Sequence, residues 1–262
     1  MLMPGRLYLV GLGLSSNFLT QATLDALRSS DVIFLDGYTS ISCDLNAELI
    51  SKLTSKEVIV AKRSQLEDEA KQLLKLAELG NVVSIASIGD PMIATTHAAL
   101  AVDAMSRGIE VKIVPGISVF CYAVSKSMLS SYKFGRSVTI TYPTGIADVT
   151  AIKVIESNFS QGLHTLTFLD IKDDKPMRVS EAFDVLREQQ SRLGRDVLGQ
   201  FQYVVVESRL GCPDEKVSVI SVNEADEDVG SPPYVIIFPS RLHFMEVDAL
   251  KWLRFKREYR ST

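Results

Sequence analysis

The stretch "NVVSIASIGDPMIATTHAALAVDAMSRG", residues 81–108, contains the pattern that decides the fold. Its first seven residues are rich in apolar, β-branched side chains, which is typical of a buried strand. Gly89, Asp90 and Pro91 then give a turn signal. From residue 96 onward, Leu, Ala and Met recur at spacings of three and four, as in an amphipathic helix. The stretch therefore predicts a strand over 81–87, a loop, and a helix over 96–108.

The same alternation of strand and helix patterns fills the first part of the chain. Further strands are expected at 6–13, 31–36, 57–61 and 110–115, and further helices at 18–30 and 66–79. Near-continuous apolar strands that alternate with helices are typical of a parallel sheet covered on both faces.

The pattern changes after Pro115 and Gly116. Strands are expected at 137–143, 163–171, 202–208, 215–221 and 233–239, a helix at 178–193, and a helix end in the basic tail 251–260. The strands on either side of "RLGCPDE" (209–215) have no helix between them, which predicts antiparallel pairing there. We therefore predict an α/β fold of two α/β domains: 1–114 with a mostly parallel sheet, and 115–262 with a mixed sheet.

Composition narrows the class of partner. The net charge of −4 provides no basic field for a nucleic-acid backbone, so a small molecule or a protein is the expected partner. No apolar run approaches the length of a membrane span, and the start "MLMPGRLYLV" lacks the apolar stretch of a signal peptide. Cys43, Cys121 and Cys212 are odd in number, lie far apart and form no C-x-x-C, which argues against a disulfide framework and a zinc site. The reducing cytoplasm is the expected compartment.

The loop after the first strand, "VGLGLSS" (10–16), resembles part of a dinucleotide fingerprint. Ser16 stands where the pattern G-x-G-x-x-G requires its third glycine, so the match is weak. Gly11 and Gly13 still permit a close backbone approach. A ligand without phosphates fits this loop better, and a tight turn that binds no ligand is the alternative.

Asp90 and His97 are the titratable residues of the loop at 89–97. A carboxylate at the end of a strand can bind the ammonium group of an amino-acid-like ligand, or it can simply stabilise the turn. His97 has no acidic or hydroxyl partner that the sequence identifies, so we expect an ordinary helix residue. The sequence contains no H-E-x-x-H, G-x-S-x-G or Walker motif. No catalytic residue and no metal ligand is therefore predicted.

Six fragments, in order along the chain, carry a resemblance to a known family. They are "VGLGL" (10–14), "YTS" (38–40), "GDPMIATTH" (89–97), "YKFG" (132–135), "GLHTLTFLDIK" (162–172) and "PPYVIIFPSRLH" (232–243). Together they resemble the diphthine synthases, which belong to the tetrapyrrole methylase class of S-adenosylmethionine-dependent methyltransferases. The resemblance runs nearly end to end, and it implies two α/β domains with the cofactor in the cleft between them.

The resemblance also implies which residues contact the cofactor. They are Leu14, Asp90, Ile93, Ser118, Val119, Leu169, Leu210 and Tyr234. At Tyr234 the family pattern predicts a histidine, and a tyrosine can still stack and donate a hydrogen bond there.

The implied activity is an N-methylation of a protein. The cofactor is S-adenosyl-L-methionine, and the methyl acceptor is the amino group of a 3-amino-3-carboxypropyl-histidine in translation elongation factor 2, a step in diphthamide biosynthesis. The resemblance further implies a homodimer in the cytoplasm that needs neither nucleic acid nor membrane. "VPGIS" (114–118) is closer to the porphyrin and precorrin methyltransferases of the same fold, which remain the main alternative. A protein that only senses the cofactor or scaffolds the elongation factor is the non-catalytic alternative.

Overall fold

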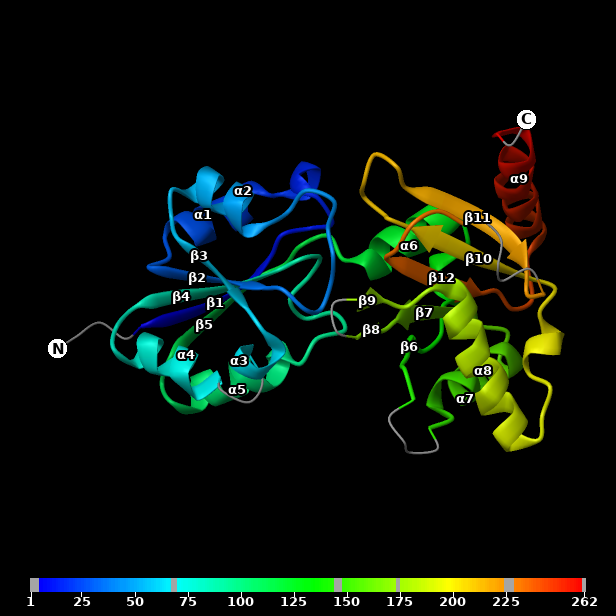
Figure 1. Cartoon of the computed structure of the whole chain (residues 1–262), viewed down its shortest axis with the longest axis horizontal. Helices are drawn as coiled ribbons and strands as arrows, with labels where there is room; N and C mark the ends of the chain where they lie inside the picture. The colour runs from blue at the N-terminus through cyan, green and yellow to red at the C-terminus, as the bar shows by residue number, and fades with distance from the viewer. Residues whose placement is uncertain (1–4, 67–69, 144–147, 173–174, 224–228, 261–262) are drawn as a thin grey trace. The chain divides into compact units, whose positions relative to one another are not determined.

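The computed structural model describes residues 5–66, 70–143, 148–172, 175–223 and 229–260. These form two compact units, Met1–Val119 and Phe120–Thr262 (Figure 1). The units therefore divide after Val119, whereas the sequence pattern placed the domain boundary after residue 114.

The first unit is built on a five-stranded parallel sheet with the order β3-β2-β4-β1-β5. Its strands are β1 (Arg6–Gly11), β2 (Val32–Asp36), β3 (Val58–Ala61), β4 (Val82–Ser87) and β5 (Glu110–Val114). Its helices are the 3-10 turn η1 (Ser16–Phe18), α1 (Gln21–Arg28), α2 (Ala47–Thr54), α3 (Arg63–Leu66), α4 (Ala70–Glu78) and α5 (His97–Ser106). The strands predicted for this part of the sequence are confirmed.

Alternating residues of β1 show why both faces of this sheet are covered. Leu7 and Leu9 belong to an apolar core shared with α4 and α5, whereas Tyr8 and Val10 belong to a second core shared with α1 and α2. Successive side chains of a strand point to opposite faces, so each face requires its own layer of helices. Figure 1 shows these two helix pairs on opposite sides of the sheet.

The second unit contains a mixed five-stranded sheet with the order β11-β10-β12-β7-β6. Its strands are β6 (Val138–Ile140), β7 (Thr165–Leu169), β10 (Tyr203–Ser208), β11 (Lys216–Ser221) and β12 (Tyr234–Phe238), and β8 (Ile171–Lys172) forms a separate ladder with β9 (Lys175–Pro176). Its helices are α6 (Val119–Ser127), η2 (Ser131–Lys133), α7 (Thr150–Ser160), α8 (Val179–Leu193), η3 (Leu198–Gln200) and α9 (Phe244–Arg260). Among the described strand pairs of this sheet, β6 and β7 pair in parallel and the others are antiparallel, including β10 and β11 as predicted.

The core of the second unit lies between one face of this sheet and the helices α7 and α8. Val206 of β10 and Phe238 of β12 pack there in the same apolar cluster as Ile152 of α7 and Phe183 of α8. The C-terminal helix α9 does not join this core and lies beside β11 (Figure 1).

None of the described helices is long and apolar enough to cross a membrane.

Candidate functional site

Three loops meet at the carboxyl edge of the parallel sheet in the first unit. They follow β1, β4 and β5, which are neighbours in the sheet and run in the same direction. The backbones of Gly13 and Gly89 exchange two hydrogen bonds, with N–O distances of 3.1 and 2.8 Å. This edge is where ligands bind in open sheets of this type.

The glycines of these loops allow the loops to contact one another. A Cβ on Gly116 would lie 2.2 Å from the carbonyl oxygen of Gly89, and one on Gly11 would lie 2.3 Å from the nitrogen of Gly116. Neither position can hold a side chain unless the backbone shifts. The close approach expected from the glycines therefore occurs between loops of the protein itself.

Asp90 anchors two of these loops. One carboxylate oxygen accepts the backbone N–H of Met92 at 2.8 Å, and the other accepts that of Gly116 at 3.1 Å. The turn-stabilising role considered from the sequence is thus present. Each carboxylate oxygen has a second lone pair, so a further donor from a ligand can still bind.

The other predicted residues of the first unit differ in exposure. Leu14 and Ser118 are buried, Val119 is half-buried at the start of α6, and the side chain of Ile93 is 42% exposed. Ala94, directly after Ile93, has a φ of 56°. A non-glycine residue in this left-handed region is uncommon and is often found at functional sites.

Two buried hydroxyl groups lie in or next to the same loops. Ser15 follows Leu14, and Ser87 ends β4. Within the described residues neither Oγ atom has a hydrogen-bond partner. Buried polar groups are normally paired, so these two hydroxyls have capacity to bind a ligand or water.

His97 is the first residue of α5, and its ring contacts the Gly-Asp-Pro loop. Its ring is buried, and Nδ1 lies 2.9 Å from the carbonyl oxygen of Pro91 in the Gly-Asp-Pro loop. Since a carbonyl only accepts, Nδ1 is the donor in this contact. Nε2 lies 3.6 Å from Oδ2 of Asp36, a buried carboxylate at the end of β2.

The sequence analysis did not identify Asp36, and in the structure this residue stabilises the turn after β2. Its carboxylate accepts the backbone N–H groups of Tyr38 and Thr39, both at 3.2 Å, and the hydroxyl of Thr39 at 2.7 Å. Asp36 ends the predicted strand 31–36, and a carboxylate in that position was the same signal that singled out Asp90. His97 and Asp36 together support the Gly-Asp-Pro loop and the "YTS" fragment.

The three predicted residues of the second unit also share one sheet edge. Because β7 and β10 both run antiparallel to β12, the ends of β7 and β10 lie beside the start of β12. Leu169 ends β7, Tyr234 begins β12, and Leu210 follows β10 by two residues. The Tyr234 hydroxyl donates to the carbonyl of Gly230 at 2.6 Å, so its ring face is the part best suited to a ligand.

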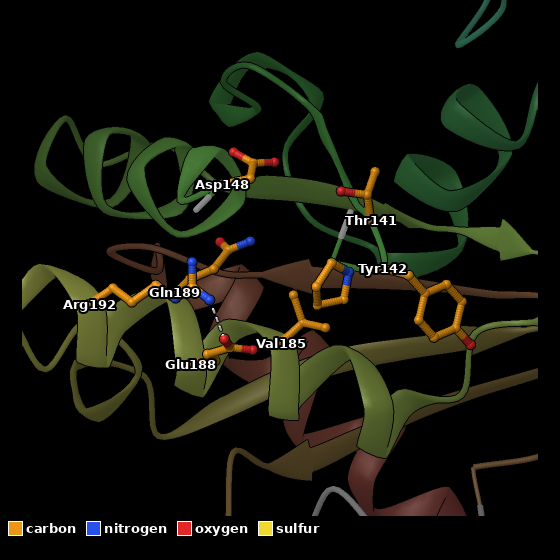
Figure 2. Close-up of a pocket in the computed structure, with 8 residues that line it drawn as sticks. Thr141, Tyr142, Asp148, Val185, Glu188, Gln189 and Arg192 are labelled. Atoms are coloured by element: carbon orange, nitrogen blue, oxygen red, sulfur yellow. Dashed lines mark hydrogen bonds and ion pairs between the residues drawn. The ribbon is translucent and has the colours of Figure 1, made fainter. Parts of the chain in front are cut away.

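A small hollow in the second unit involves none of the predicted residues. It is lined by Thr141, Tyr142, Pro143, Asp148, Val185, Glu188, Gln189 and Arg192, and Figure 2 shows Glu188 and Arg192 joined on its α8 side. Burial, together with a hydrogen bond from its hydroxyl to Glu181 at 3.1 Å, raises the pKa of Tyr142 to about 12. The volume of this hollow, about 30 Å³, is enough for water but not for a nucleoside.

Comparisons of the sequence and of the structure with known proteins identify one and the same family. Residues 6–226 match the family of tetrapyrrole (corrin/porphyrin) methylases. A diphthine synthase of Saccharolobus solfataricus is 47% identical over 251 residues, which cover 94% of this chain and 98% of the relative. One from Metallosphaera sedula is 48% identical over 250 residues, with the same coverage.

Solved structures agree with these matches. A crystal structure of diphthine synthase has a TM-score of 0.85 at 30% identity and covers 95% of this chain and 96% of its own. That of a putative diphthine synthase from Entamoeba histolytica has a TM-score of 0.84 at 27% identity, covering 95% and 98%. The chain therefore belongs to the tetrapyrrole methylase family and, within it, to the diphthine synthases.

Proposed function

We propose that this methyltransferase uses S-adenosyl-L-methionine to methylate the amino group of a 3-amino-3-carboxypropyl-histidine in translation elongation factor 2. The observation that carries the proposal is the 47% identity to a diphthine synthase over nearly the full length of both chains. Because this match spans both units, the aligned residues include those at the two sheet edges described above.

The residues at those edges are suited to a cofactor with an amino acid and a nucleoside part. In the first unit, Asp90 has lone pairs for an ammonium group, Leu14 and Ile93 are apolar, and the hydroxyls of Ser15 and Ser87 have unused hydrogen-bonding capacity. In the second unit we assign Leu169, Leu210 and the ring of Tyr234 to the same cofactor. Ser118 and Val119 complete the proposed set.

The chemistry requires little from the side chains of the protein. The sulfonium of the cofactor supplies an electrophilic methyl group. The neutral acceptor amine forms the new N–C bond as the S–C bond breaks, and the nitrogen then loses one proton to water. An amine of this type titrates near pH 8 by model values, so an appreciable fraction is neutral at pH 7. The residues of the chain can then act by holding the reactants in line.

The absence of basic residues from the three loops of the first unit disfavours the porphyrin alternative. A tetrapyrrole substrate carries several carboxylates, which arginine and lysine would be expected to bind. Residues 11–18, 88–96 and 115–118 contain no Arg or Lys. The fragment "VPGIS" remains the feature that this chain shares with those methylases.

Binding and transfer can be tested separately with labelled S-adenosylmethionine. Equilibrium dialysis measures binding, and purified elongation factor 2 carrying the unmethylated 3-amino-3-carboxypropyl group then measures transfer. We expect both, and mass spectrometry of the modified histidine peptide counts the methyl groups. Binding without transfer would support the sensing or scaffolding alternative, whereas transfer to a polycarboxylate tetrapyrrole alone would support the porphyrin alternative.

We also propose a homodimer in the cytoplasm. Val102 and Met105 of α5 and Ile113 of the edge strand β5 are exposed apolar side chains on neighbouring elements, which suits a subunit interface. The compartment follows from the proposed substrate, because elongation factors act on ribosomes. Light scattering should give twice the chain mass of 28.9 kDa, and a monomer at micromolar concentration would contradict the dimer.

A further inference from the structure

The loop that carries Leu210 has an unusual backbone. It covers residues 209–215, "RLGCPDE", between β10 and β11. Arg209 has a φ of 47°, in the left-handed region that non-glycine residues rarely occupy. Such a conformation persists only when surrounding contacts hold it.

Several contacts hold this conformation at Arg209. Its backbone N–H donates to the carbonyl of Pro233 at 3.0 Å, and its own carbonyl accepts the N–H of Cys212 at 3.0 Å. Its Nε atom lies 2.6 Å from a carboxylate oxygen of Asp214. The start of the loop is therefore fixed against the segment that precedes β12.

Glu215 holds the next part of the same loop. Its Oε2 atom accepts the backbone N–H of Gly211 at 3.0 Å and the hydroxyl of Tyr122 at 2.9 Å, and its Oε1 atom binds the ammonium of Lys126. Burial alone would raise the pKa of Glu215, but the hydrogen bonds from Lys126, Gly211 and Tyr122 outweigh it and lower the pKa. Glu215 is thus an ionised acceptor at neutral pH.

The bond from Gly211 acts directly on Leu210. The N–H of Gly211 belongs to the peptide that joins Leu210 to Gly211, and in a trans peptide the N–H and C=O point in opposite directions. When Glu215 binds this N–H, the Leu210 carbonyl must point away from Glu215. Tyr122 and Lys126 lie four residues apart on α6, so one face of that helix fixes Glu215.

We propose that Glu215, held by Tyr122 and Lys126, is a positioning residue for the cofactor: it fixes the plane of the Leu210–Gly211 peptide. This proposal rests on the proposed function, in which Leu210 contacts S-adenosylmethionine. Glu215 touches neither cofactor nor acceptor. Its removal should change cofactor affinity and leave the chemical step nearly intact.

The test compares Glu215→Ala with Glu215→Gln and with a matched control. At metal sites, loss of an outer-shell partner typically weakens binding by about 10- to 100-fold, and we take the lower end of that scale as the guide here. We expect the dissociation constant for S-adenosylmethionine to rise by about tenfold or more in Glu215→Ala, while kcat at saturating cofactor stays within about threefold. Glu215→Gln keeps an oxygen for the Gly211 N–H and should recover most of the affinity. Glu188→Ala removes a glutamate that pairs with Arg192 on the surface of the same unit and should bind like the wild type.

The outcomes separate this proposal from the proposed function. If the wild type neither binds nor transfers, the proposed function fails. If the wild type is active and Glu215→Ala binds the cofactor normally, or loses kcat with unchanged affinity, the positioning role is wrong. If Glu215→Ala shows no cooperative unfolding, Lys126→Met provides the test. This variant removes the ammonium that binds Oε1 of Glu215, whereas Tyr122 still binds Oε2, so we expect a smaller rise in the dissociation constant for S-adenosylmethionine. An unchanged dissociation constant in folded Lys126→Met would then overturn the proposal.

Discussion

At the scale of single residues, Glu207 and Glu246 show how one type of side chain responds to opposite surroundings. Glu246 is buried, but Lys133, His164 and the backbone N–H groups of Ser130 and His243 all donate to it. Burial raises its pKa, and these donors outweigh burial and bring it to about 2. Glu207 is fully buried in β10, and neither of its oxygens has a partner within the described residues. Burial, followed by the charge of Glu215, raises the pKa of Glu207 well above its usual value.

Glu207→Gln should change the pH dependence of stability. The unfolded chain releases the Glu207 proton above about pH 4.3, whereas the folded chain retains it to higher pH, so wild-type stability is lost as pH rises between the two pKa values. Glutamine removes this loss. We expect the stability of the variant relative to the wild type to increase from pH 4 to pH 8, measured by urea unfolding. Parallel pH profiles for the two proteins would contradict a raised pKa of Glu207 in the folded protein.

Asp90→Ala should weaken cofactor binding more than it slows transfer. The carboxylate contributes a charge for an ammonium group and also anchors Met92 and Gly116. Loss of a charged hydrogen bond corresponds to about 1.5–3 kcal/mol, or roughly 10- to 150-fold in the dissociation constant. Asp90→Asn keeps one of the two acceptor oxygens for the turn and loses the charge. Calorimetric titration of both variants with S-adenosylmethionine distinguishes the roles, because unchanged affinity in both would leave Asp90 as a turn residue only.

At the scale of elements, the start of α9 is fixed by segments far apart in the sequence. His164 precedes β7; its Nδ1 atom accepts the N–H of Ser240 at 2.9 Å and its Nε2 atom lies 3.0 Å from Glu246. Since Nδ1 is an acceptor, the neutral ring donates from Nε2. Lys133 of "YKFG" and His243 of "SRLH" reach the same carboxylate. Three of the fragments that carry the family resemblance thus meet at the edge of the second sheet opposite Leu169 and Tyr234.

Glu246→Gln should lose stability at neutral pH and become less sensitive to acid. The folded pKa of about 2 lies below the unfolded value near 4.3, so the carboxylate stabilises the fold above the unfolded pKa, and this contribution disappears as pH falls toward 2. The difference corresponds to about 3 kcal/mol at pH 7. Denaturant unfolding at pH 7 and pH 3 should show a large gap between wild type and variant that narrows in acid. A gap that is equal at both pH values would contradict this account.

Periodicity predicted the strands better than the helices, for physical reasons. The buried strands of both units are continuous apolar runs, so their positions can be predicted from the sequence alone. No helix was predicted at the eight-residue helix α2 (Ala47–Thr54), which spans little more than two turns. α6 (Val119–Ser127) begins with the apolar run "VFCYAV", which a strand could equally contain, and α7 (Thr150–Ser160) mixes β-branched residues with a helical period.

Across the whole molecule, the sequence indicated candidate site residues but not the residues that hold them in place. Asp90 could be identified because it follows a buried strand. The contacts of His97 with Pro91 and Asp36, and of Gly211 with Glu215, depend on loop shape, and Asp36 is 61 positions before His97. No local pattern encodes such distances. The resemblance supplied the remaining residues, and their contacts with the cofactor stay a prediction.

The proposed mechanism, in which the protein positions the reactants and supplies no base, gives a prediction for the pH dependence of transfer. The predicted cofactor residues are apolar apart from Asp90, Ser118 and Tyr234, and His97 is buried and committed to the Pro91 carbonyl. The single-turnover rate at saturating cofactor and acceptor should therefore rise with pH as the acceptor amine loses its proton and then level off. Rapid-quench measurements across pH 6–10 give this profile.

His97→Ala decides whether that interpretation holds. Without the ring, the Gly-Asp-Pro loop loses its support, so we expect weaker cofactor binding. The pH profile at saturating cofactor should nevertheless keep its shape and midpoint, because the titrating group is on the substrate. His97→Asn can still donate to the Pro91 carbonyl and should recover part of the affinity. If His97→Ala bound both cofactor and elongation factor normally yet no longer transferred the methyl group, the imidazole would be the base, and positioning alone would not explain the reaction.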